Sequence, residues 1–151
     1  MTFDRPDPEY LDGELVERHL GDIKHSATQK KLMFALQSLE RDGKVLLFPE
    51  LHLRTSASGY QVADLAIFLE QPAGRIPSLP PCISIEIVSP DDSLSGIRGK
   101  SEEYRAWSVR HIWLVDPNSC TFTVYESGIR DVERFQLPEL GFELTPEQVF
   151  G

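Results

Sequence analysis

The chain is poor in cysteine and has neither a long apolar run nor an internal repeat. Its 151 residues include two cysteines, too few for the disulfide framework of a small secreted protein. No apolar run approaches the about 18 residues of a membrane span, and residues 1–7 lack the basic and apolar segments of a signal peptide. We therefore expect a cytoplasmic protein without membrane contact, in which Cys82 and Cys120 are buried free thiols.

The composition indicates one ordinary globular domain. Apolar residues make up 40% of the chain and charged residues 26%, as is typical of soluble folded proteins. A chain of this length buries roughly 68–70% of the surface that it exposes when unfolded, so it needs no structural metal or disulfide to build a core. We predict a single domain over residues 1–151.

Basic residues are outnumbered, with 15 Lys and Arg against 24 Asp and Glu and a net charge of −9. A net acidic chain at first argues against nucleic acid as a partner. The excess lies at the ends, however. Residues 1–17 hold six acids and one base, residues 126–151 hold six acids and two bases, and the middle of the chain is neutral. This distribution is compatible with a positive cleft in the middle segment, and equally with ordinary solvated surface charge.

Hydrophobic spacing predicts a mixed α/β domain. Leu32, Leu36 and Leu39 recur at helical spacing between a capping box at 26–29 and a stop at 42–43. Strands are predicted at 44–48, 51–55, 61–69, 82–89, 111–115 and 121–126, with turns at 12–13 and 116–119. A polar loop at 89–99 precedes a second helix over about 100–109. The order of these elements gives a sheet covered by at least one helix.

Two carboxylates interrupt strands that are otherwise apolar. The strand predicted at 61–69 is apolar on both alternating faces, with Ala63 and Leu65 on the same face, except at Asp64. Glu86 is a similar exception in the strand that follows. A carboxylate in such a setting needs an ion pair, hydrogen bonds or a metal. One interpretation is a Mg²⁺ or Mn²⁺ site formed by both residues; the other leaves each in solvent or beside an arginine.

The two predicted helices add further candidates. Lys100, Tyr104 and Trp107 share one face, and the aromatic rings make it the face against the sheet. The Lys100 ammonium then points toward the strands, where it can orient a water or stabilise a charged phosphate; the alternative is a lysine that snorkels at a helix end. His25 precedes the first predicted helix at the rim of the sheet, in a site or in a packing role. The loop 89–99 is either a mobile flap or a plain connector.

In their order along the chain, these blocks resemble the Uma2 family (DUF820), a bacterial branch of the PD-(D/E)XK restriction-endonuclease-like superfamily. The resemblance runs from about residue 9 to residue 126. It is carried by His25, Lys100, Tyr104 and four runs, EYLDGELV at 9–16, VADLAIF at 62–68, IEIVSP at 85–90 and WLVDP at 113–117.

The resemblance implies a restriction-endonuclease-like core, a mixed sheet flanked by helices. It implies that Asp64, Glu86 and the main-chain carbonyl of Ile87 hold Mg²⁺ or Mn²⁺. The superfamily pattern puts a lysine at position 88, which is Val here. The family's lysine on the following helix corresponds to Lys100, which agrees with the helix-face argument.

The resemblance also implies an activity and partners. Glu14 and His25 match further family positions, at the periphery of the site, where they would bind a second ion or the substrate backbone. The implied function is a metal-dependent endonuclease that hydrolyses phosphodiester bonds of DNA, and we expect the chain to form a homodimer.

Three positions depart from the family pattern, and they keep other functions open. Ala63 replaces a proline, Gly96 replaces an aspartate four residues before Lys100, and His111-Ile112 replaces Glu-Tyr. The glycine and the acidic charge favour an alternative, an inactive nuclease-fold module that binds nucleic acid or a protein partner. Metal binding separates the two, because only the nuclease requires it. Hydrolysis of a small metabolite is a third possibility, although no G-x-S-x-G nucleophile motif is present.

Overall fold

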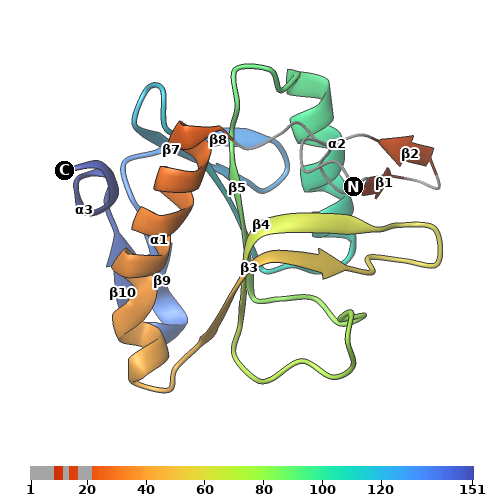
Figure 1. Ribbon diagram of the computed structural model, residues 1–151, viewed down its shortest axis with the longest axis horizontal. Helices are drawn as coiled ribbons and strands as arrows, with labels where there is room; N and C mark the ends of the chain where they lie inside the picture. The colour runs from red at the N-terminus through yellow and green to blue at the C-terminus, as the bar shows by residue number, and fades with distance from the viewer. Residues whose placement is uncertain (1–8, 12–13, 17–21) are drawn as a thin grey trace.

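The structure is a computed structural model that describes residues 9–11, 14–16 and 22–151. Its centre is a six-stranded sheet in the order β3-β4-β5-β6-β7-β8 (Figure 1). β5 and β6 are parallel, and the other neighbouring strands of this sheet pair antiparallel. The strands are β3 (Leu46–Leu53), β4 (Gln61–Phe68), β5 (Ile83–Ile87), β6 (His111–Asp116), β7 (Thr121–Tyr125) and β8 (Ile129–Val132).

Helices and two small hairpins flank the sheet. The parallel pair β5–β6 needs a crossover connection, which α2 (Leu94–Ala106) supplies. The β1–β2 hairpin (Glu9–Leu11 and Glu14–Val16) lies beside α2 (Figure 1). On the other side lie α1 (Ile23–Arg41), α3 (Pro146–Phe150) and the hairpin of β9 (Phe135–Leu137) and β10 (Phe142–Leu144), with the 3₁₀ turn η1 (Pro138–Leu140) between its strands. The predicted mixed sheet flanked by helices is confirmed.

Two apolar clusters hold these layers together. The α1 cluster joins the leucines of α1 to the sheet and to β9, β10 and α3. In it the Phe135 ring stacks on Trp113 and Phe122, with ring centroids 4.4 and 4.1 Å apart. The α2 cluster packs Tyr104 of α2 against the sheet, with Trp107 at its margin. Both aromatic residues therefore face the sheet, as their spacing with Lys100 predicts.

The first helix is longer than the sequence pattern indicates. It begins at Ile23 because Asp22, and not Ser26, is the N-cap: the Asp22 carboxylate accepts a hydrogen bond from the His25 amide at 2.8 Å. The helix ends at Arg41, and Gly43 follows with a φ of 72°. The predicted stop at 42–43 is confirmed.

The second helix corrects the interpretation of the loop at 89–99. Helix α2 begins at Leu94, six residues before the predicted start, so much of the expected flap is helical. The Ser93 hydroxyl caps it by accepting a hydrogen bond from the Gly96 amide at 3.0 Å. A Cβ atom at Gly96 would lie 2.9 Å from that hydroxyl oxygen, so the glycine leaves room for the cap.

The β3–β4 hairpin corrects two further predictions. The strands predicted at 44–48 and 51–55 form one strand, β3, which continues through Pro49. Ala63 packs in the α2 cluster whereas Leu65 packs in the α1 cluster, so the prediction that they share a face is wrong. The alternation of β4 side chains between the two faces of the sheet is broken at Asp64, opposite Glu50, whose φ is 49°.

The cysteines and the end of the chain also differ from expectation. Both thiols are free, but Cys82 is only partly buried and Cys120 is exposed in the turn between β6 and β7. Strands β8, β9 and β10 and helix α3 were not predicted; each has at most five residues. Among the described residues, none of the helices is long and apolar enough to cross a membrane.

Candidate active site

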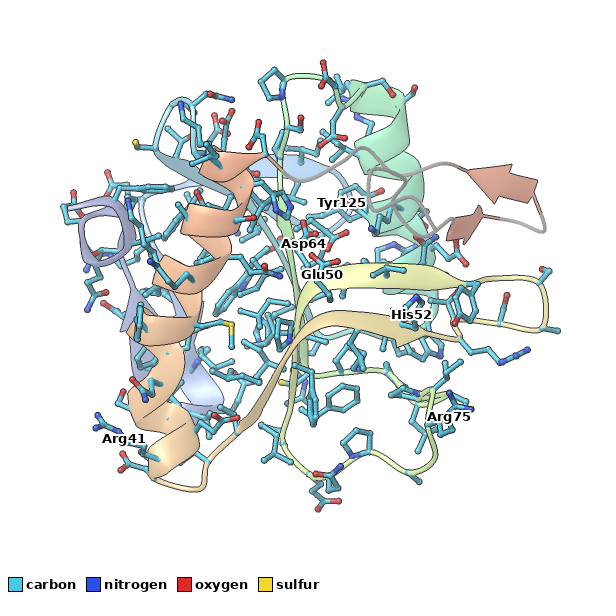
Figure 2. The ribbon with its side chains drawn as sticks, viewed as in Figure 1. Arg41, Glu50, His52, Asp64, Arg75 and Tyr125 are labelled. Atoms are coloured by element: carbon cyan, nitrogen blue, oxygen red, sulfur yellow. The ribbon has the colours of Figure 1, made fainter. Side chains whose placement is uncertain are left out.

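Three carboxylates form one row across three neighbouring strands. Pro49 pairs with Leu65 and Leu51 with Ala63, so the register places Glu50 of β3 opposite Asp64 of β4. The pairing of β4 with β5 begins at Leu65 and Ile85 and, extended by one residue, places Asp64 opposite Glu86. Figure 2 shows Glu50 and Asp64 close together at the middle of the molecule. The register of three strands thus brings together residues that are far apart in the sequence.

At this row, hydrogen bonds from main-chain amides to carboxylates replace the regular main-chain hydrogen bonds between β4 and β5. The Asp64 amide donates to Oε2 of Glu86 at 3.0 Å, and the Ile87 amide donates to Oδ2 of Asp64 at 2.8 Å. Asp64 is 5% exposed, so these hydrogen bonds satisfy groups that water scarcely reaches. The carboxylates that accept these hydrogen bonds can also bind a cation.

Lys100 reaches the same point from α2. Its ammonium forms an ion pair with Oε1 of Glu86 and donates to the carbonyl oxygen of Val62 at 2.9 Å. The Lys100 and Glu86 side chains are 19% and 13% exposed, so the pair is largely shielded but still reachable by water. The sequence-predicted trio of Asp64, Glu86 and Lys100 therefore meets at one place.

Helix α1 closes the other side of Asp64. The His25 Nε2 atom lies 3.2 Å from Oδ1 of Asp64. Gln29, one turn further along the helix, donates to the Asp64 carbonyl oxygen at 2.7 Å and to Oε1 of Glu50 at 3.3 Å. His25, Glu50 and Asp64 each offer one ligand atom, and these three atoms lie within 4.8 Å of one another.

The electrostatics of the site keep Asp64 ionised. Burial raises the pKa of its carboxyl, but the hydrogen bond from His25, the charges of Lys100 and His25 and the Ile87 amide together outweigh burial. The net result is a pKa of Asp64 below its ordinary value. A buried carboxylate that stays charged is well suited to hold a cation.

Two predicted residues are placed less fully. The main-chain amide of Ile87 donates a hydrogen bond to Asp64, and the role of its carbonyl as a metal ligand stays a prediction. Glu14 lies in β2 opposite Leu11, but its side chain lies outside the described residues.

Two residues of the site were missed in the sequence. They are Glu50 and Gln29, and Gln29 carries no visible signal in the sequence. The Pro-Glu pair within an apolar strand was the available hint for Glu50, because a charged residue there needs a reason similar to that for Asp64.

The donor set fits a divalent cation. Asp64, Glu86 and Glu50 supply carboxylate oxygens, the ligands preferred by Mg²⁺ and Mn²⁺, and His25 adds an imidazole nitrogen. Asp64 is both buried and ionised, which requires positive charge nearby. Lys100 and His25 supply part of that charge in the structure, and Glu50 lies exposed beside them.

Comparison with known proteins shows the family of the chain. The family model described as "Uma2: Putative restriction endonuclease" matches residues 2–151. The chain belongs to the Uma2 family. The match spans the whole described chain, including the C-terminal β9–β10 hairpin and α3, beyond the blocks that resemble the family in sequence.

A solved structure shares the Uma2 fold. It is titled "Crystal structure of a putative nuclease belonging to DUF820 from Anabaena variabilis ATCC 29413" and superposes with a TM-score of 0.82 at 23% sequence identity. The alignment covers 96% of this chain and 90% of that one. This similarity establishes the fold. No curated protein matches the sequence.

Proposed function

We propose that this Uma2 protein is a metal-dependent endonuclease that hydrolyses phosphodiester bonds of DNA. The observation that carries the proposal is the meeting of Asp64, Glu86 and Lys100 at one largely shielded point. Two carboxylates and a lysine in such contact suit phosphodiester hydrolysis, since they offer cation ligands beside a proton-transfer or charge-stabilising group. The description of the family as restriction endonucleases supports the same class of reaction.

In this proposal Asp64 and Glu86 hold Mg²⁺ or Mn²⁺, with the Ile87 carbonyl as a further ligand. When bound, the ion polarises the phosphate and lowers the pKa of the attacking water. The low pKa of Asp64 ensures that its carboxylate is available as a ligand at neutral pH.

Lys100 then acts on the substrate side. The Val62 carbonyl and Glu86 hold its ammonium at the row of carboxylates, where it orients the water or stabilises charge on the phosphate. Its position on α2 explains how Val88 can stand where the superfamily pattern has a lysine, because the ammonium reaches Glu86 from the helix instead of from the strand.

Cleavage of DNA with matched variants tests this function. Supercoiled plasmid and single- and double-stranded oligonucleotides of DNA and RNA are incubated with Mg²⁺, Mn²⁺ or EDTA. We expect nicking of DNA that EDTA abolishes, and a loss of about 10²-fold or more in Asp64→Asn and Lys100→Met, the range typical of groups that act on the reacting atoms. Glu126→Gln, an exposed carboxylate paired with Arg130, is the matched control and should cleave at the wild-type rate.

The outcome also decides between the proposal and the binding-module alternative. Wild type that binds DNA but leaves every substrate intact with both metals would overturn the nuclease and favour a non-cleaving module. Cleavage of RNA alone would correct the substrate. The homodimer stays a prediction, for which the molecular mass in solution is the measurement.

A further inference from the structure

The side of Asp64 that faces α1 holds a set of donors that Asp64, Glu86 and Lys100 leave unexplained. His25 and Gln29 of α1 contact Asp64 directly, and Gln29 also donates a hydrogen bond to Glu50 of β3. We propose that Glu50 and His25 are ligands of the divalent ion together with Asp64, and that this nitrogen-containing set favours Mn²⁺ over Mg²⁺. The inference rests on the divalent ion of the proposed function.

The separations of the ligand atoms fit one ion. Metal–ligand bonds of about 2.0–2.1 Å put neighbouring ligands of an octahedral ion about 3 Å apart and opposite ligands about 4 Å apart. Nε2 of His25 and Oδ1 of Asp64 are 3.2 Å apart, as two neighbouring ligands are, and all three donor atoms lie within 4.8 Å. The exposed Glu50 side chain would supply the third ligand atom.

The placement of Glu50 is specific. Its backbone lies in the left-handed region at a φ of 49°, where a residue with a side chain is rarely found. Asp64 lies opposite Glu50, and Gln29 donates a hydrogen bond to the Glu50 carboxylate at 3.3 Å. The chain thus keeps a glutamate, held by a glutamine, at a strand position whose backbone would suit glycine.

The donor types set the choice of metal. Mg²⁺ prefers oxygen ligands and keeps several waters, whereas imidazole nitrogen binds first-row transition ions more readily. His25 therefore tilts a carboxylate site from Mg²⁺ toward Mn²⁺. Asp64 belongs both to this set and to the pair with Glu86. The residues can therefore hold one ion, or two ions that share Asp64 as a ligand.

Metal binding, and not only cleavage, tests the inference. The Kd values for Mn²⁺ and Mg²⁺ are measured by calorimetry, with free Mn²⁺ counted by electron paramagnetic resonance, for wild type, Glu50→Gln, Glu50→Gly and His25→Gln. We expect both Glu50 variants to weaken Mn²⁺ binding at least about tenfold, since loss of even an outer partner of a metal site typically costs 10–100-fold. His25→Gln should lower the ratio of Mn²⁺ to Mg²⁺ affinity about tenfold or more.

Thermal unfolding in EDTA separates ligand loss from a change in the fold. Glu50→Gly relieves the left-handed backbone, so its Tm without metal should rise by about 2–4 °C while its Mn²⁺ affinity falls. Ser108 has a φ of 76° outside the site, so Ser108→Gly is the matched control. It should raise the Tm in the same way and leave the Kd for Mn²⁺ unchanged.

Each result decides a definite part of the inference. Wild-type Mn²⁺ affinity in both Glu50 variants, in a protein that cleaves DNA, would overturn the role of Glu50 and leave the nuclease standing. An unchanged metal ratio in His25→Gln would overturn the donor-set argument. Weakened Mn²⁺ binding in the variants of a wild type that never cleaves would support the ligand set and overturn the nuclease. A wild type that binds neither ion would overturn both.

Discussion

Replacing Lys100 by methionine should separate metal binding from cleavage. The ammonium of Lys100 forms an ion pair with Glu86, so in the proposed function it competes with the divalent cation for that carboxylate. Met keeps the apolar stem of the side chain and removes the charge. We therefore expect Lys100→Met to bind Mn²⁺ more tightly than wild type and to lose cleavage.

The size of the effect follows from the burial of the pair. Removing one partner of a buried ion pair costs about 3–5 kcal/mol. With 19% and 13% exposure of the two side chains, we take about 3 kcal/mol for the metal-free protein. In a domain of this size each kcal/mol shifts the Tm by about 2–4 °C, so the Tm of Lys100→Met in EDTA should fall by about 6–12 °C.

Metal should then restore much of the loss. A cation at one hundred times its Kd stabilises the folded state by about 2.7 kcal/mol, close to the cost of leaving the Glu86 carboxylate without its lysine. The assay is thermal unfolding of wild type and Lys100→Met in EDTA and across a Mn²⁺ titration, with plasmid cleavage in parallel. A variant as stable as wild type in EDTA, and no more responsive to Mn²⁺, would refute the idea that lysine and cation share Glu86.

The remaining predictions concern the rest of the fold. Partial burial raises the pKa of Glu139, but hydrogen bonds with His111 and Arg110 lower it to about 2. A carboxylate with a lowered pKa stabilises the fold at pH values above its unfolded pKa, and this stabilisation is lost as the pH falls toward the folded pKa. The difference in urea stability between wild type and Glu139→Gln should therefore be full near pH 7 and vanish between about pH 4.5 and pH 2. An unchanged difference at pH 2 would contradict that linkage. Phe135→Ala, which removes the ring stacked on Trp113 and Phe122, should cost about 3–5 kcal/mol in urea unfolding; a loss below 1 kcal/mol would show that the β9–β10 hairpin is fixed by other contacts.

Short-range spacing determined part of the fold in advance. Leu32, Leu36 and Leu39 predicted α1, since residues at that spacing share one face of a helix whatever lies around it. The same rule placed Lys100 on the face of α2 that meets the sheet. The helix starts were less accurate, because either Asp22 or Ser26 can cap α1 and glycines at 96 and 99 look like a loop. The caps that formed depend on which hydroxyl or carboxylate reaches a free amide.

The C-terminal elements could not be predicted for a different reason. Strands of three or four residues are too short to show an alternation. Phe135, Leu137 and Leu144 are buried only because the hairpin that carries them folds back onto the α1 cluster. That packing is a long-range event without a local pattern.

For the candidate site, the sequence by itself determined which residues were out of place. Asp64 and Glu86 stood out because an isolated charge in an apolar strand needs a partner, and that requirement can be read without coordinates. Only the tertiary structure decided which residues are the partners of these carboxylates. The register of β3 on β4 sets Glu50 beside Asp64, and the packing of α1 sets His25 there. Register depends on contacts between strands, and these exist only once the chain has folded.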